Sequence, residues 1–283
     1  MLGGFPIDVI IIIAGTAFLC EYIDSTLGMG YGTALTPVLL LFGYSPLQIV
    51  PAVLISELIT GLLAGFFHHR AGNVNLKPET TNIGQIVNQL NSLGYIESFN
   101  RGIPRHLKVA LMLAACSILG TVGAVFVAVS IPKLWLKIYI GVLVLSMGIL
   151  IFVCINKNFA FSWKKITSLG LLASFNKGIS GGGYGPLVTC GQIMAGVEGK
   201  SAIGITSLAE ALTCAVGVIT YLLVSKSALD LQLAPLIIAG AVFSVPLSAM
   251  TVKRTNVKHM RALIGTMSVI LGIVTLSQTF MKG

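Results

Sequence analysis

The chain has 283 residues, of which 55% are hydrophobic and only 10% are charged. This composition excludes an ordinary soluble domain and indicates a polytopic membrane protein. The formal net charge of +9 does not indicate nucleic-acid binding, because the basic residues border apolar stretches, where the cytoplasmic preference for positive charge explains them.

The apolar segments predict helices in chain order, starting with a span at 6–23 that ends at Glu21 and Asp24. Two later segments, 33–43 and 186–196, are too short to cross a bilayer and are typical of discontinuous helices. The other expected segments are 46–67, 107–130, 133–155, 165–176, 201–224, 231–252 and 259–280.

Residues 69–105 form the only long polar region of the sequence. Apolar residues recur there at helical spacing after Pro78, which predicts one amphipathic helix at the membrane surface. A regulatory role and a solvated linker helix both stay open for it. The apolar residues are Ile83, Ile86, Val87, Leu90 and Leu93.

Two glycine-rich breaks, at 28–32 and 181–185, are copies of each other. A shift of 153 positions without a gap superposes them and continues into the next helix, where Glu57 falls on Glu210 and Thr60 on Thr213. The other paired residues are Gly28 and Gly181, Gly30 and Gly183, Tyr31 and Tyr184, Gly32 and Gly185, Thr36 and Thr189, and Gly43 and Gly196.

We therefore predict an all-α polytopic membrane protein built from two repeats of about five helical segments, each with a glycine-broken helix. The first repeat comprises 1–68 and 106–155, and the second comprises 156–283. Residues 69–105 are expected to be a cytoplasmic insertion with the amphipathic helix. An odd number of segments per half inverts the second copy in the membrane, provided that every segment crosses.

The positions of the basic residues agree with this inversion. If the N-terminus is outside, thirteen of the eighteen Lys and Arg residues fall on the inside, as the positive-inside rule requires. The outside loops then keep Lys133, Lys137, Lys226 and Lys282, and Lys177 lies at the second break. An eight-span protein with parallel repeats, in which the short segments are re-entrant, stays open as the alternative.

The breaks are the expected substrate site. Glycine lets backbone N–H groups approach a ligand closely, and helices that begin after the breaks direct their positive ends at an anion. Pro186 favours a helix start there. Close packing of helices is the alternative role of the glycines. The expected substrate-binding residues are Gly28, Gly30, Tyr31, Gly32, Asn176, Lys177, Gly181, Gly182, Gly183, Tyr184 and Gly185.

These motifs resemble the sulfite exporter TauE/SafE family of membrane permeases. The resemblance rests on the two breaks, on Pro37-Val38-Leu39 and on residues 201–207, and it covers nearly the whole chain outside 69–105. It implies transport of sulfite, organosulfonates or related sulfur oxyanions. A tyrosine replaces a glycine in each motif, and Cys190-Gly191-Gln192 replaces the second Pro-x-Leu, which points to an unusual member or to a ligand outside this class.

Ionisable residues inside apolar spans are functional candidates by default. Lys177 follows Asn176 at the second break, and the repeat register puts Asp24 at the equivalent position. We expect Lys177 to bind the anion and Asp24 to balance or gate it. An Asp24–Lys177 ion pair, or a lysine that reaches the membrane interface, is the alternative.

Glu57 and Glu210 lie near the centres of their helices, with Thr60 and Thr213 within one turn. A carboxyl group in an apolar span can exchange a proton, so these residues are candidates for proton coupling or gating. A protonated acid that only holds helices together is the alternative. Glu21 is expected to be an interfacial acid at a helix end.

The sequence thus predicts a secondary active transporter of small anions in the cell membrane that works by alternating access and is proton-coupled through the two glutamates. An anion channel, or a transporter of a different small anion, is the alternative. An enzyme is not expected, because no H-x-x-x-H motif occurs, and the five scattered cysteines indicate no metal. The expected partners are the lipid bilayer and a small anionic substrate, without nucleic acid or a cofactor; the oligomeric state is open.

Overall fold

The computed structural model describes residues 7–78, 80, 82, 84–85, 87–88, 91–92, 97, 101–154, 162–195, 197–224, 232–252 and 257–281. All regular structure in these residues is helical, which confirms the expected all-α class. The helices are α1 (Ile7–Leu27), α2 (Tyr31–Leu41), α3 (Pro46–Arg70), α5 (Arg105–Ser130), α6 (Lys133–Cys154), α7 (Trp163–Ser180), α8 (Tyr184–Met194), α9 (Gly199–Val224), α10 (Leu233–Val242), α11 (Ser244–Val252) and α12 (Val257–Met281).

The lengths of these helices separate spanning segments from half-length ones. Among the described residues, five stretches are long and apolar enough to cross a membrane: α3, α5, Lys133–Leu150 of α6, α9, and Leu233–Val252, which comprises α10 and α11. By contrast, α2 and α8 have 11 residues each. A helix of that length rises about 16 Å, roughly half the hydrocarbon thickness of a bilayer.

Two helices before the breaks are longer than the sequence predicts. α1 continues past Asp24 to Leu27, and α7 continues past Lys177 to Ser180. The expected helix ends at these residues are therefore wrong. The charged side chains stay inside their helices because they are buried against protein rather than lipid, where they find polar partners.

Equivalent helices of the two halves pack against each other in antiparallel pairs. Leu54 of α3 lies against Gly217 of α9, whereas His68, further along α3, lies against Gly204, nearer the start of α9. Glycines at such crossings let the helix backbones approach closely.

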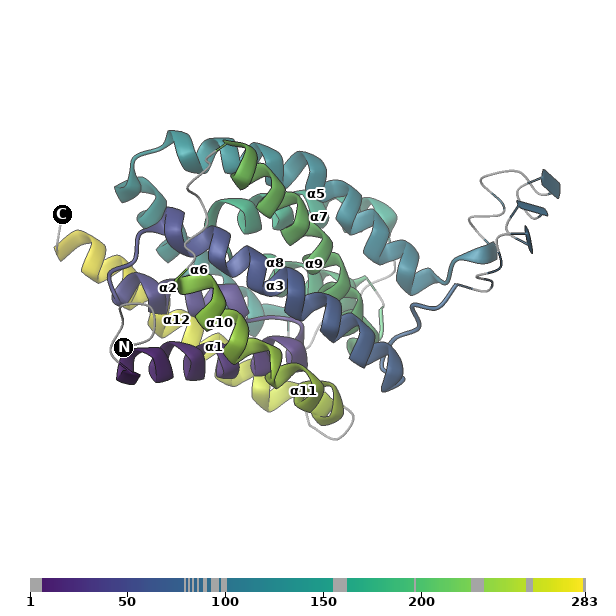
Figure 1. The fold of residues 1–283 in the computed structure, drawn as a ribbon, viewed down its shortest axis with the longest axis horizontal. Coiled ribbons are helices and arrows are strands. Elements are labelled where there is room, and N and C mark those ends of the chain that lie inside the picture. Colours follow the sequence, from purple (N-terminus) through teal and green to yellow (C-terminus); the bar gives the residue numbers. More distant parts are fainter. Residues whose placement is uncertain are drawn as a thin grey trace.

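The same pattern relates the other helices. α6 packs on its equivalent, α12, while α1 packs on α10 and α11 in the way that α7 packs on α5. In Figure 1 the start of α1 and the end of α12 lie at the same end of the bundle. The packing within the described residues is thus that of two similar halves, and their orientation in a bilayer stays a prediction.

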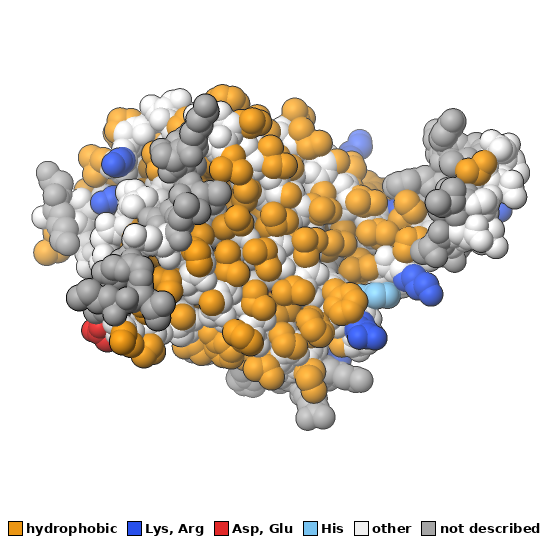
Figure 2. Space-filling view, viewed as in Figure 1, with side chains coloured by type: hydrophobic (Ala, Val, Ile, Leu, Met, Phe, Trp, Pro, Cys, Tyr) orange, Lys and Arg blue, Asp and Glu red, His pale blue; other side chains and the backbone are white. Residues whose placement is uncertain are grey.

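The surface has the distribution expected for a bilayer protein. Figure 2 shows hydrophobic side chains across the middle of one face, with the visible Lys and Arg side chains towards the two ends of the long axis. Exposed Leu119 and Ile118 of α5 and Leu223 of α9 contribute to the apolar surface of the molecule. Four of the five apolar residues of the expected amphipathic helix lie outside the described residues: Ile83, Ile86, Leu90 and Leu93.

Candidate functional site

The two glycine breaks meet, and they do so through their backbones. A Cβ atom on Gly32 would overlap the carbonyl oxygen of Gly181, and one on Gly185 would lie 2.6 Å from the carbonyl oxygen of Gly28. These two contacts exchange with each other under the repeat register. The close-packing role that the sequence left open for the glycines is therefore present at Gly32 and Gly185.

The turns that precede α2 and α8 also require glycine. Gly28 and Gly181 have φ values of 67° and 72°, a left-handed conformation that side chains with a Cβ rarely adopt. This turn ends each long helix and lets the half-length helix start a few residues later, inside the protein. The sequence predicts that α8 starts at Pro186, whereas it starts two residues earlier, at Tyr184.

The amino end of α2 is occupied by two acidic side chains of the same chain. The backbone N–H of Tyr31 donates to Asp24 Oδ1 at 3.1 Å, and that of Gly32 donates to Glu57 Oε1 at 3.2 Å. Free N–H groups and the positive end of the helix dipole favour negative charge at this position. The expected anion-binding helix end thus holds carboxylates in this structure.

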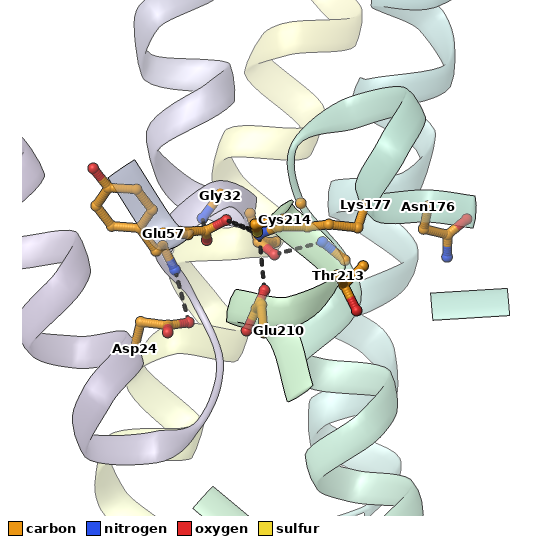
Figure 3. Close-up of polar contacts among 12 residues, drawn as sticks. Asp24, Gly32, Glu57, Asn176, Lys177, Glu210, Thr213 and Cys214 are labelled. Carbon is orange, nitrogen blue, oxygen red and sulfur yellow. Dashed lines mark hydrogen bonds and ion pairs between the residues drawn. The ribbon is translucent and has the colours of Figure 1, made fainter. Parts of the chain in front are cut away.

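Buried charged side chains gather beside the breaks and form a central cluster: Glu21, Asp24, Glu57, Lys177 and Glu210. Lys177 lies at the centre of this cluster and has no exposed surface. Its ammonium group forms ion pairs with Glu57 and with Glu210, the latter at 2.8 Å between Nζ and Oε1 (Figure 3). The two glutamates come from α3 and α9, one from each half. Lys177 therefore pairs with the glutamates, whereas the Asp24 carboxylate accepts from the α2 backbone.

Glu21 belongs to the same cluster, and the prediction of an interfacial acid is wrong. Its side chain is buried and accepts hydrogen bonds from Ser25 at 2.9 Å and from Thr60 at 3.0 Å. The signal in the sequence is that Glu21, Asp24 and Ser25 share one face of α1. This polar face packs towards α3, and α1 continues beyond it.

A small cavity lies among the four acids. It has a volume of about 10 Å³, near the minimum for one water molecule. Because four carboxyl groups and the single amine of Lys177 are buried together, the cluster has excess negative charge unless protons neutralise it. The cavity is lined by Glu21, Asp24, Glu57, Thr60, Gly61, Ala64, Ser207 and Glu210.

Three other expected site residues, Asn176, Thr213 and Thr60, form their hydrogen bonds away from Lys177, Glu57 and Glu210. Asn176 Oδ1 accepts a hydrogen bond from the Tyr139 hydroxyl of α6, at 2.5 Å, and Thr213 donates to the backbone oxygen of Ala209 in its own helix. Neither side chain contacts the glutamates by a hydrogen bond in the described structure. Thr60 contacts Glu21 rather than Glu57.

The two tyrosines differ in their contacts although they are equivalent in the repeat. The Tyr31 hydroxyl shares a hydrogen bond of 2.7 Å with Ser56, whereas Ala209 occupies the position equivalent to Ser56 in the second half. The Tyr184 hydroxyl is buried without a hydrogen-bond partner among the described residues. The thiol of Cys214, a residue with no predicted role, donates to Glu57 Oε2 at 3.6 Å.

The described residues contain no group of three or more His, Cys, Asp or Glu side chains arranged to hold a metal ion. The hydrogen-bond donors of the site include the Lys177 amine and the N–H groups at the amino end of α2, and in this structure they are paired with the carboxylates of the site itself. All of them suit an oxyanion.

Comparison with known proteins identifies the family of the chain. The sequence profile of the "Sulfite exporter TauE/SafE" family matches residues 13–83 and 80–275. The chain is 25% identical over 279 residues to the "Probable membrane transporter protein YtnM" of Bacillus subtilis (strain 168), covering 94% of this chain and 82% of that protein. No solved structure matches. Together with the long apolar helices, these matches establish a multi-pass membrane protein of a transporter type.

Proposed function

Because the chain belongs to the sulfite exporter TauE/SafE family, we propose that it is a secondary active transporter of small sulfur oxyanions such as sulfite or organosulfonates in the cell membrane. The observation that carries this proposal is the position of the Glu57 carboxylate. It bridges the Lys177 ammonium group and the backbone N–H of Gly32 at the amino end of α2.

A carboxylate in that position stands in for a substrate oxyanion. Sulfite and sulfonate groups present several acceptor oxygens on one negatively charged group, as a carboxylate does. They can therefore accept from the same ammonium group and helix amino end. On this proposal the substrate and the glutamates alternate as partners of Lys177.

The small size of the central cavity supports alternating access rather than a permanent pore. A space of about 10 Å³ holds one water molecule and excludes a sulfur oxyanion, so the halves must separate before the substrate binds. The glycine breaks are the surfaces that would separate, because the two halves touch there through their backbones. An open anion channel would need a continuous polar passage at this point.

Protons would couple to the anion through Glu57 and Glu210. When a glutamate is protonated, it no longer forms an ion pair with Lys177, and its repulsion of an incoming anion falls. Anion binding then favours protonation to the same extent, because such coupling is reciprocal. The anion and the proton would move in the same direction.

Uptake of radiolabelled sulfite into proteoliposomes tests this function. We expect saturable uptake that is accelerated by an inward proton gradient and is reduced by unlabelled organosulfonates. Empty liposomes and liposomes with the Lys177→Met variant are the controls. Saturable, proton-driven uptake of another small anion without competition by sulfite would overturn the substrate class, and non-saturable conductance would favour a channel.

A further inference from the structure

A second cavity lies at one end of the bundle, where α2 ends, α6 begins and α12 ends. Its volume is about 260 Å³, slightly below the range of pockets for drug-sized ligands. A space of this size suits a small headgroup. It is lined by Leu40, Leu41, Gly43, Lys133, Leu134, Lys137, Thr275, Gln278 and Thr279.

The lining carries positive charge without a compensating acid. Lys133 and Lys137 lie one turn apart on the same side of α6, and no acidic residue lines the cavity in the described structure. The ion pairs found among the described residues involve neither lysine. Lys133 is also the first residue of α6, so the free N–H groups of that helix end add to the positive field.

A buried hydroxyl at the same cavity lacks a partner. Thr275 is 97% buried, and its Oγ1 has no hydrogen-bond partner in the described structure. The neighbouring Thr279 hydroxyl instead donates to the backbone oxygen of Thr275 at 2.7 Å. A buried polar atom without a partner is unfavourable, so this hydroxyl indicates that a ligand atom completes the site.

The last turn of α2 also borders the cavity, but its carbonyl groups already have hydrogen-bond donors and do not need the two lysines. The backbone carbonyl groups in its last turn already accept hydrogen bonds, with Phe42 N bound to Val38 O at 3.1 Å and Gly43 N bound to Leu40 O at 3.0 Å. We propose that this cavity binds one tetrahedral oxyanion group, of the phosphate or sulfate type, through Lys133, Lys137 and Thr275.

Two sources could supply such a group, and the surroundings favour a lipid phosphate. Trp135 and Leu134 beside the cavity are 63% and 47% exposed, as is typical of side chains at the interface between water and lipid. An anionic phospholipid would place its phosphate in the cavity and its acyl chains along the apolar surface of α6 and α12. A free sulfate or phosphate ion would occupy the same position from the water.

The test measures binding to the intact protein in neutral detergent. The probes are short-chain phosphatidylglycerol, phosphatidylcholine of the same chain length, and inorganic sulfate and phosphate. The Lys133→Gln/Lys137→Gln double variant should lose about 10-fold or more in affinity for the anionic probe that binds. Thr275→Val keeps the volume of the side chain and should lose roughly 3- to 10-fold, because one hydrogen bond is removed.

The matched control is Lys164→Gln/Lys165→Gln, which removes two lysines from the first turn of α7. It should bind all probes as the wild type does. Loss of phosphatidylglycerol binding alone would assign a lipid headgroup, and the same losses with sulfate or phosphate would assign a free oxyanion. Equal affinity of the cavity variants and this control for every probe would overturn the proposal. Because the central cluster is unchanged in all these variants, failure here leaves the transport proposal standing.

Discussion

Lys177 and Asp24 occupy equivalent repeat positions and differ in charge, and this difference determines the charge balance of the central cluster. They occupy equivalent positions on α7 and α1, yet one carries a positive charge and the other a negative charge. A strictly symmetric protein with acids at both positions would bury carboxylates without a cation. The lysine supplies the charge that holds Glu57 and Glu210 in the centre.

Replacing Lys177 with Ala should weaken binding of a sulfur oxyanion by roughly 10-fold or more, because a desolvated charge-assisted contact is lost. Binding is measured by titration of the purified protein with sulfite. The same change leaves two buried carboxylates unpaired, and breaking a buried pair costs about 3–5 kcal/mol, so thermal unfolding is measured alongside.

The Lys177→Met/Glu57→Gln/Glu210→Gln variant separates binding from stability. It removes all three charges together, so it should regain thermal stability but not sulfite binding. Its sulfite affinity is compared with that of the Glu57→Gln/Glu210→Gln protein, which keeps the lysine. Equal affinity of these two folded variants would remove Lys177 from the site.

Replacing Glu57 or Glu210 with Gln should flatten the pH dependence of transport. Gln keeps the size of the side chain and most hydrogen bonds but cannot titrate. At alkaline pH, sulfite should bind the variants roughly 10-fold or more tightly than the wild type, because like charges within about 4 Å repel by a few kcal/mol at an effective dielectric constant near 20. Flux and binding are measured from acidic to alkaline pH.

The control for the glutamates is Glu97→Gln in the polar insertion, where Glu97 pairs with Arg101 on the surface. It should keep the wild-type pH profile. If both central variants also keep that profile and still accumulate substrate with a proton gradient, the glutamates only hold helices together.

At the scale of the elements, the two glycine breaks pack closely against each other through their backbones. Replacing Gly32 with Ala should destabilise the folded protein by about 1–3 kcal/mol or more, since the added methyl group would overlap the Gly181 carbonyl. Gly15→Ala in α1 is the matched control, because a Cβ there meets nothing within 4 Å.

Thermal unfolding in detergent measures both glycine changes. The control should be neutral or more stable by up to about 1 kcal/mol, as expected for Gly to Ala in a helix. A Gly32→Ala protein as stable as the control would show that the breaks do not need to touch.

The sequence predicts the helices well, but it predicts the central cluster of Lys177 and the four acids only in part. The repeat register and the apolar lengths predict the half-length helices, because glycine turns and short segments are local features. They do not predict that α1 continues through Glu21 and Asp24, since the burial of these acids depends on α3 and α9, which are distant in the sequence. For the same reason the pairing of Lys177 with Glu57 could not be read from spacing.

At the scale of the whole molecule, the antiparallel pair of α3 and α9 determines which loops share an end of the bundle. Ser201, near the start of α9, donates to the backbone oxygen of Asn73 at 3.3 Å, and Gly204 lies against Val74 and His68. The start of α9 is therefore beside the end of α3. The end of α9, at Val224, is at the opposite end of the bundle.

This arrangement predicts that the 69–105 region and the loop at 225–230 lie on opposite sides of the membrane. Asn82→Cys should react with a membrane-impermeant maleimide from the cytoplasmic side, where the positive-inside rule places the basic insertion. Ser227→Cys should react only from the other side. Labelling is measured in right-side-out and inside-out vesicles. The unmodified protein is the control for reaction of the five native cysteines, of which Cys20, Cys116 and Cys214 are buried. Reaction of both sites from one side would contradict the inverted repeat and favour the parallel eight-span topology.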